Sequence, residues 1–133
     1  MKYRYYIAPL VVFMLGCSHG PELAPVTGRV SMDGRPLDLA EISFEPIQGR
    51  ASHAMTEKDG RYELRYTRDK MGGLVGSHTV RIKSLTELTG PNGQSIVRPQ
   101  LVPDRYNTKT ELHTEVERGK TNVIDFDLKS GKK

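Results

Sequence analysis

The sequence predicts an all-β protein whose short strands pack as two sheets, in a β-sandwich that follows an N-terminal export segment. From Val26 onward, apolar and polar residues alternate with a period of two, which is typical of strands with one buried face. Turn signals rich in glycine, proline and aspartate separate these runs at short intervals. No segment has a convincing helical period of 3.6 residues.

The first two predicted strands follow each other closely. Residues 26–32 place Val26 and Val30 on the same face. Asp33-Gly34 then supplies the positive φ that a tight hairpin turn needs. In the next strand, the residues of one face are Ala40, Ile42 and Phe44, and those of the other are Glu41, Ser43 and Glu45.

The strongest hairpin signal lies at residues 52–66. A second Asp-Gly turn, Asp59-Gly60, stands at its centre. The apolar or small residues that face each other across this turn are Ser52, Ala54 and Thr56 on one side, and Tyr62, Leu64 and Tyr66 on the other. The pattern predicts two antiparallel neighbours joined at Gly60.

The second half of the chain alternates strands with longer connections. Residues 67–76 are predicted to form a loop, and residues 84–105, with three prolines and Asn92-Gly93, a long irregular crossover. Further strands are expected at 78–82, 112–116 and 124–128. About seven one-sided strands bury their apolar faces most simply between two packed sheets. One domain, residues 26–129, and a short tail, residues 130–133, follow from this pattern.

The first sixteen residues read as an export signal. Lys2 and Arg4 form a basic start, and residues 7–16 are apolar except for Pro9. This apolar stretch is too short to cross a bilayer, which needs roughly 20 apolar residues. We therefore expect a signal peptide at residues 1–16.

The end of this segment, Met14-Leu15-Gly16-Cys17, resembles the lipobox of bacterial lipoproteins. The resemblance implies cleavage between Gly16 and Cys17, and attachment of acyl chains such as palmitate to Cys17. Leucine is more usual at the position of Met14. Two or three acyl chains hold a protein firmly on a membrane. A linker, residues 17–25, would then carry the domain, whereas a plain signal peptide would leave Cys17 as a free thiol.

The charge of the processed chain gives no sign of a nucleic-acid partner. Removing residues 1–16 takes away Lys2 and Arg4, which leaves 18 basic and 16 acidic residues and a net charge of +2. No block of basic residues interleaved with aromatic ones is present. We therefore expect no binding of nucleic acid.

Several segments resemble the carboxypeptidase regulatory-like domains, which belong to the transthyretin-like (prealbumin-like) sandwiches. They are VTGRV (26–30), DGRPL (33–37), AEISFEP (40–46), TEKDGRYEL (56–64), GSHTVRI (76–82), VPDRYN (102–107) and GKTNVIDFDL (119–128). The resemblance implies a seven-stranded Greek-key β-sandwich. It concerns turns and core positions, so it implies a fold and no activity. Tyr106 is expected to pack its ring and to bond backbone in the crossover through its hydroxyl.

No catalytic set is visible, and no catalytic residue, metal ligand or cofactor is assigned. The histidines His19, His53, His78 and His113 lie far apart in sequence. The C-terminal Tyr-Arg-Gly-Ser of the hydroxyisourate hydrolases is missing. The ligand spacing of the intradiol dioxygenases is absent too. Asp125 and Asp127 with Glu115 and Glu117 would form an acidic stripe, which suits calcium, if the last two strands pair. A solvated face is the favoured interpretation.

These observations predict a non-catalytic lipoprotein of the cell envelope, exported and anchored to a membrane, with the outer membrane favoured. An envelope protein or a glycan is the expected partner. Residues 84–105 are the expected contact surface, because rigid sandwiches usually present function on loops. The alternative is a small enzyme or a periplasmic metal-binding protein of the transthyretin-like kind.

Overall fold

The computed structural model describes Gly16 and residues 19–131. Its regular structure consists of fifteen short strands and one 3-10 turn, so the described part is nearly all β, as predicted. Residues 1–15 and Cys17 lie outside the described residues. The signal peptide at residues 1–16 and the lipidation of Cys17 therefore stay predictions.

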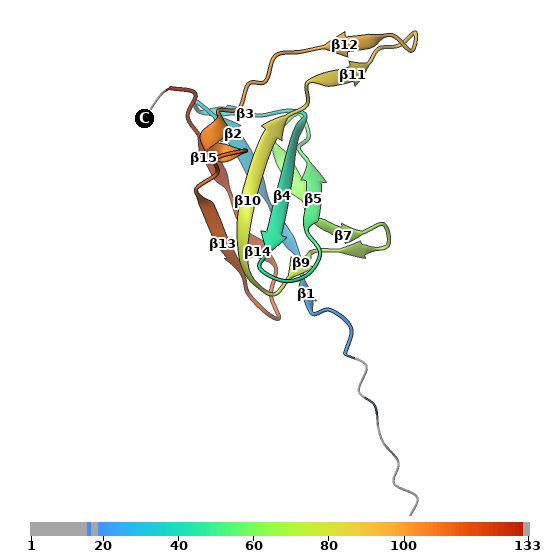
Figure 1. Cartoon of the computed structure of the whole chain (residues 1–133), viewed down its shortest axis with the longest axis vertical. Coiled ribbons are helices and arrows are strands. Elements are labelled where there is room, and N and C mark those ends of the chain that lie inside the picture. The colour runs from blue at the N-terminus through green and yellow to red at the C-terminus, as the bar shows by residue number, and fades with distance from the viewer. Residues whose placement is uncertain (1–15, 17–18, 132–133) are drawn as a thin grey trace, which may run out of the picture.

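The larger sheet has six strands in the order β13-β10-β4-β5-β7-β8 (Figure 1). Their bounds are Leu112–Val116 for β13, Gly76–Ser84 for β10, Ala40–Pro46 for β4, Ser52–Met55 for β5, Arg65–Thr67 for β7 and Lys70–Met71 for β8. The antiparallel ladder between β4 and β10 runs from His78 opposite Pro46 to Ser84 opposite Ala40. This ladder forms the centre of the sheet.

The smaller sheet is built around β2 (Val26–Met32). On one side it pairs with the antiparallel strands β3 (Arg35–Pro36) and β6 (Arg61–Glu63). On the other side it pairs with the parallel strands β14 (Asn122–Val123) and β15 (Phe126–Leu128). Outside the two sheets, β1 (Leu23–Ala24) pairs with β9 (Gly73–Leu74), and β11 (Glu87–Thr89) pairs with β12 (Ser95–Val97).

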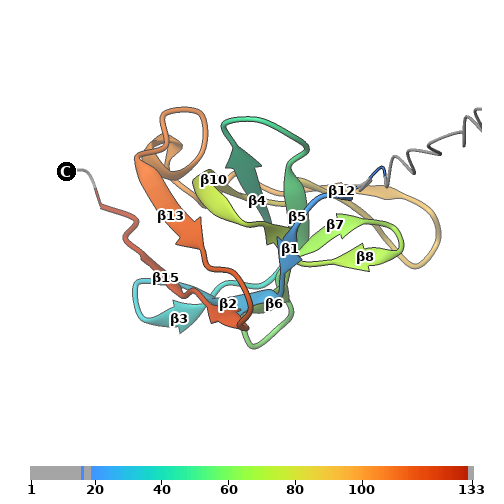
Figure 2. The same cartoon turned by 90° about the horizontal axis from the view of Figure 1, so that it is seen from below.

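The two sheets face each other and enclose the core (Figure 2). The fully buried side chains come from the apolar faces of both sheets, as one-sided strands predict; the largest are Phe44, Ile42, Leu64, Ile82, Leu128, Val26, Val30, Val80 and Val116. The ring of Phe44 lies 6.2 Å from that of Phe126 and 6.4 Å from that of Tyr62. These rings come from both sheets and join them.

The hairpin predicted at residues 52–66 forms only in part. Strands β5 and β7 are antiparallel neighbours, with His53 opposite Arg65, and the Glu57 amide donates to the Arg61 carbonyl at 2.9 Å beside the Asp59-Gly60 turn. Between them, β6 pairs with β2 in the smaller sheet and not with β5. The Leu64 amide still donates to the carbonyl of Val26, after which β7 joins the larger sheet. The chain therefore changes sheets after Leu64.

Two predicted irregular segments contain strands. Residues 67–76 carry β8 and β9, and residues 84–105 carry the β11–β12 hairpin and the 3-10 turn η1 (Asp104–Tyr106). Brief runs of two or three paired residues give too little alternation to be recognised from sequence. Because such short pairings divide the regular structure into many pieces, the fifteen observed strands do not correspond one to one with the seven expected.

Both ends of the domain extend past the expected limits of 26–129. Strand β1 lies in the expected linker, and Ala24 is buried. At the other end, the carboxylate of Asp33 accepts hydrogen bonds from the backbone amide of Ser130, at 3.1 Å, and from its hydroxyl. The hydroxyl of Tyr106 accepts from the amide of Lys129 at 3.0 Å, so it binds the end of the last strand rather than the crossover. These contacts form a C-terminal latch.

Acid is expected to release this latch. The hydrogen bonds from Ser130 hold the pKa of Asp33 below its ordinary value of 3.8. Because the folded pKa is lowered, the ionised carboxylate favours the latched state above the ordinary pKa, and this contribution is lost as the pH falls through the lowered one. The Ser130 amide resonance should move between about pH 5 and about pH 2. In Asp33→Asn, the chemical shift of this resonance should not change over the same pH range. A chemical shift that does not change with pH in the unaltered protein would contradict the prediction.

Candidate functional site

The β11–β12 hairpin projects from one end of the sandwich (Figure 1). It leaves the end of β10, where Ser84 lies opposite Ala40. The start of β10, where Gly76 lies opposite Val116, is at the other end of the same strand. At about 3.3 Å per residue, these two ends lie roughly 26 Å apart. We call residues 85–101 the distal hairpin.

The side chain of Gln100 fixes the base of the distal hairpin. Its Oε1 accepts from the amide and the hydroxyl of Ser84, both at 2.7 Å, and from the amide of Val102 at 3.2 Å. Its Nε2 donates to the Ser84 carbonyl at 3.2 Å. The amide thus takes the place of a strand neighbour and sets the direction in which the hairpin leaves the sheet.

Removing the side-chain amide of Gln100 is expected to loosen the distal hairpin and to have little effect on the rest of the domain. In Gln100→Ala, the amide protons of residues 85–101 should exchange with solvent about tenfold faster, because a local opening loses roughly 1–2 kcal/mol of hydrogen bonding. The midpoint of global unfolding should barely change. Hydrogen exchange followed by NMR measures both. Gln100→Glu keeps the acceptor oxygens and is the matched control; equal exchange in Gln100→Ala and the unaltered protein would contradict the prediction.

The surface of the distal hairpin carries little charge and three exposed aliphatic side chains among uncharged polar ones. Glu87 and Arg98 are its only charged residues. Val97 is 81% exposed, and Ile96 and Leu101 are each about two-fifths exposed. Strands β11 and β12 pair with each other and with no other strand of the described chain. Their outer edges therefore leave backbone donors and acceptors open to an added strand.

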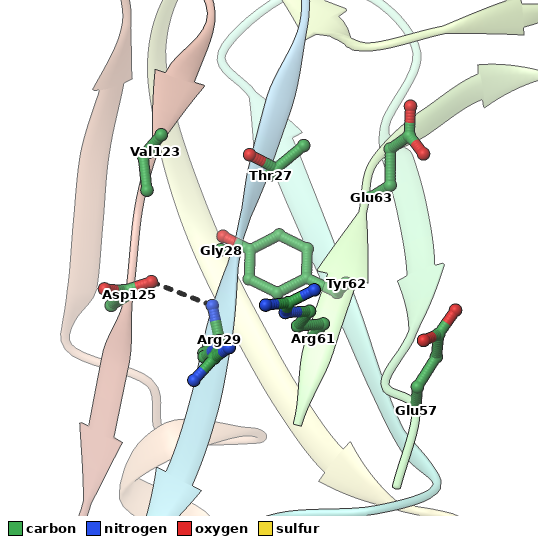
Figure 3. Close-up of a pocket in the computed structure, with 9 residues that line it drawn as sticks. All are labelled: Thr27, Gly28, Arg29, Glu57, Arg61, Tyr62, Glu63, Val123 and Asp125. Carbon is green, nitrogen blue, oxygen red and sulfur yellow. Dashed lines mark hydrogen bonds between the residues drawn. The ribbon is translucent and has the colours of Figure 1, made fainter. Parts of the chain in front are cut away.

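A second candidate surface is a hollow of about 610 Å³ over β2, β6 and β14 (Figure 3). Arg29 lies directly opposite Arg61 in the antiparallel ladder, so both point to the outer face. The carboxylates of Glu57, Glu63 and Asp125 border them. We call this surface the arginine hollow.

The floor of the arginine hollow is tightly packed, at the point where the pairing of β2 is interrupted between β14 and β15. Gly28 leaves room for the ring of Tyr62, whose hydroxyl donates to the Ile124 carbonyl at 2.5 Å. The Arg29 amide donates to the carboxylate of Asp125 at 2.8 Å, in place of a backbone carbonyl. Burial, and to a smaller degree the charge of Asp125, raises the pKa of Tyr62 far above its ordinary value. The phenol therefore stays protonated and keeps its donor role.

The arginine hollow suits a ligand that carries oxygen anions. A guanidinium group presents several donors in a plane that fits carboxylate or phosphate. Like charges placed directly opposite each other cost stability. This cost is offset by the exposed ion pair of Arg61 with Asp59, at 3.3 Å, and by the carboxylates of Glu57, Glu63 and Asp125 that border the two guanidinium groups. The bordering carboxylates could accept from the hydroxyl or amino groups of the same ligand.

The histidines do not meet in one site. His53 and His113 are exposed on the outer face of the larger sheet, whereas His78 is buried. The Nε2 of His78 lies 2.7 Å from the carbonyl of Leu74, and its Nδ1 has no partner among the described residues. No group of three or more His, Cys, Asp or Glu residues in the described part could hold a metal ion.

The predicted acidic stripe does not form. It required the last two strands to pair, but β13 pairs with β10, whereas β14 and β15 pair with β2. Glu115 therefore lies in the larger sheet, and Asp125 and Asp127 lie beside the smaller one. Asp127 accepts from the hydroxyl of Ser31 at 2.9 Å and pairs with Lys129 at 3.5 Å. These contacts make it part of a solvated face.

Two features of these surfaces escape sequence reasoning. The alternating pattern puts Arg29 and Arg61 on polar faces, but only the register of β2 and β6 brings them together. Residues 84–105 were expected to form a long irregular crossover, so the β11–β12 hairpin within them was not foreseen. The described residues contain no helix of the length and apolarity that crossing a bilayer requires.

Comparisons with known proteins assign no family. No family model and no curated protein matches the chain. Two solved structures resemble it: a 9R-lipoxygenase from Cyanothece, at 13% identity, and a DUF3823 family protein from Parabacteroides merdae, at 12%. Each match has a TM-score of 0.43 and covers 81% of this chain, but only 16% and 46% of the other chain, respectively. The chain thus spans less than half of either protein, and likenesses this weak assign no function.

Proposed function

We propose that this chain is a non-catalytic, lipid-anchored lipoprotein of the cell envelope that binds another envelope protein through its distal hairpin. The observation that carries the proposal is the position of that hairpin. It projects from the end of the sandwich opposite to the end where the N-terminal segment enters (Figure 1). An anchor at Cys17 would thus leave the hairpin free to meet a partner away from the membrane.

The character of the hairpin supports a protein partner. A two-stranded hairpin is marginally stable alone in water, and an added strand would satisfy one of its open edges. Exposed Val97 and Ile96 offer apolar contact area beside such a strand. With only one acidic and one basic residue, the hairpin offers little charge for selecting a strongly charged ligand.

The fold proposed for this module is the seven-stranded Greek-key sandwich of the carboxypeptidase regulatory-like domains. The turn and core residues of the resembling segments support it. Gly34 and Gly60 both have a φ of +79° in their Asp-Gly turns. Phe44, Tyr62 and Phe126, which come from three of these segments, pack together in the core.

A photo-crosslinking amino acid at position 97 tests the binding proposal in cells that make the protein. We expect one defined envelope protein to be captured there and not with the same group at Val123, which is 71% exposed on the smaller sheet. The purified partner should then bind Val97→Asp at least about tenfold more weakly, with unchanged unfolding of the domain. Equal capture at both positions would overturn the proposal. So would stoichiometric metal that is lost in His78→Ala or His113→Ala, because it would favour the metal-binding alternative.

A glycan is the second candidate ligand, and the opposed pair Arg29 and Arg61 favours an acidic one. Calorimetric titration of the purified protein with an oligogalacturonate should show binding that weakens at least about tenfold in Arg61→Gln. A neutral oligosaccharide of equal length is the control ligand. Equal heats for both sugars would remove the arginine hollow as a glycan site and leave the hairpin proposal standing.

A further inference from the structure

Several separate segments meet at the end of the sandwich where the N-terminal segment enters. Leu23 pairs with Leu74, and Glu22 forms an ion pair with Arg118 at 2.7 Å. A side chain at Gly49 would meet the Leu74 side chain at 2.7 Å, so the β4–β5 turn lies against the same residues. We call this surface, formed by residues 22–24, 47–51, 72–76 and 117–121, the tether end.

Ile47 stands out on the tether end. It is 90% exposed, more than any other large hydrophobic side chain of the described residues. It follows β4 directly and lies in the short turn before β5. An isoleucine in this position contributes nothing to the core and leaves its apolar surface in contact with water.

Several basic side chains lie in the turns of the tether end and on the hairpin that follows β7. Arg50, Arg118 and Lys120 lie in the two turns of the tether end, and Arg68 and Lys70 lie on the neighbouring β7–β8 hairpin. Three acids, Glu22, Asp69 and Glu117, lie in the same segments as these five bases, and Glu45 and Glu115 line a hollow that Ile47 also lines. Arg118 and Lys120 form ion pairs with Glu22 and Glu117. Arg50, Arg68 and Lys70 have no ion pair within the described part of the chain, so their charges face solvent.

The tether is short. Because β1 begins at Leu23, only residues 18–22 separate it from Cys17. At up to about 3.6 Å per residue, this segment spans at most roughly 20 Å. An acylated Cys17 would therefore hold the tether end within reach of the membrane surface. Basic residues are attracted to an anionic membrane surface, and an exposed apolar side chain is stabilised when it enters the headgroup boundary.

We infer that the tether end lies on an anionic bilayer, with Ile47 in the headgroup region and Arg50, Arg68 and Lys70 near lipid phosphates. The inference rests on the proposed anchoring at Cys17. The second contact fixes the tilt of the sandwich on the membrane. It thereby directs the distal hairpin away from the bilayer, whereas a tether alone would let the domain tumble.

The absence of tryptophan from the chain makes this contact measurable. The full lipidated chain carrying Ile47→Trp is reconstituted into vesicles of phosphatidylcholine with or without phosphatidylglycerol. Brominated acyl chains in the bilayer quench tryptophan that reaches the headgroup boundary. We expect about twofold quenching and a blue-shifted emission in the anionic vesicles. Val97→Trp, on the distal hairpin, should show neither. Adding Arg50→Glu and Lys70→Glu to Ile47→Trp should remove most of the quenching.

The outcomes separate this inference from the anchoring on which it rests. Protein that floats with the vesicles while Ile47→Trp stays unquenched would overturn the inference and leave the anchor in place. Protein that does not float would overturn both. Equal quenching of Ile47→Trp and Val97→Trp would place the domain on its side and also overturn the inference. Ile47→Cys with an environment-sensitive label gives a second reading should the tryptophan disturb the turn.

Discussion

One added methyl group at Gly28 is expected to destabilise the whole domain. In Gly28→Ala, the new Cβ would lie 1.9 Å from the carbonyl oxygen of Ile124 and 2.9 Å from the ring of Tyr62. The Ile124 carbonyl cannot simply move aside, because it accepts a hydrogen bond from the Tyr62 hydroxyl at 2.5 Å. The Ile124 amide also donates to the Thr27 carbonyl at 2.8 Å. Relief of the clash must therefore separate β2 from the segment between β14 and β15.

The expected loss is about 2–6 kcal/mol of the free energy of unfolding. Overpacking in a dense core costs typically 1–3 kcal/mol, and a buried carbonyl that loses its donor about 1–3 kcal/mol more. A domain of this size has only about 5–15 kcal/mol in all. Urea unfolding followed by circular dichroism measures the change. Thr27→Val, one residue away on the outer face, is the matched control and should stay within roughly 0.5 kcal/mol. An unchanged midpoint in Gly28→Ala would contradict this account.

The alternating strands were sufficient to predict much of the core, although Ala24, Leu37 and Val102, which lie outside those strands, are also buried in it. Alternation alone put Ile42, Phe44 and Leu64 on inward faces, and all three are fully buried. This works because the side-chain period of a strand is local and depends on no partner. The Asp-Gly turns were predictable for the same reason, since positive φ at Gly34 and Gly60 is a property of the turn itself.

Strand pairing was not predictable, because the choice of neighbour depends on contacts far apart in the chain. Residues 61–63 alternate as well against β5 as against β2, and only the change of sheet after Leu64 decides between them. For the same reason, an acidic stripe was considered that does not form, because proximity in sequence suggested that the last two strands pair. The dependence on distant contacts also hid the arginine hollow, where Arg29 and Arg61 meet through the register of separate strands.

The distal hairpin lies in a segment that was expected to be an irregular crossover, and its two strands were not foreseen. Each of its strands holds three paired residues, and Leu88 opposite Ile96 is its single cross-strand pair of large aliphatic residues. Such a brief pattern is easily lost among glycines and prolines. Its direction depends on Gln100, a polar residue whose contacts with Ser84 no periodicity reveals.

Replacing Cys17 with serine is expected to abolish acylation of the chain. The thioether sulfur has no counterpart in serine, so labelled palmitate should fall to background and the signal should stay uncleaved. Each buried methylene of an acyl chain contributes about 0.8 kcal/mol to membrane binding, which the weak contact proposed for the tether end cannot replace. Palmitate labelling and the mass of the purified chain measure acylation and cleavage directly.

A rescue variant separates the lipobox from other uses of a cysteine. The double variant Cys17→Ser, Ser18→Cys puts Leu15 three residues before the cysteine and keeps a small residue directly before it. It should recover palmitate labelling, with cleavage one residue later than in the unaltered chain. Ser18→Ala should label normally. Persistent labelling and cleavage in Cys17→Ser alone would remove the proposed anchor, and with it the reason for the sandwich to stand on a membrane with its hairpin outward. A double variant that stays unlabelled while Cys17→Ser loses its label would instead show that the position of the sulfur, and not only its presence, decides recognition.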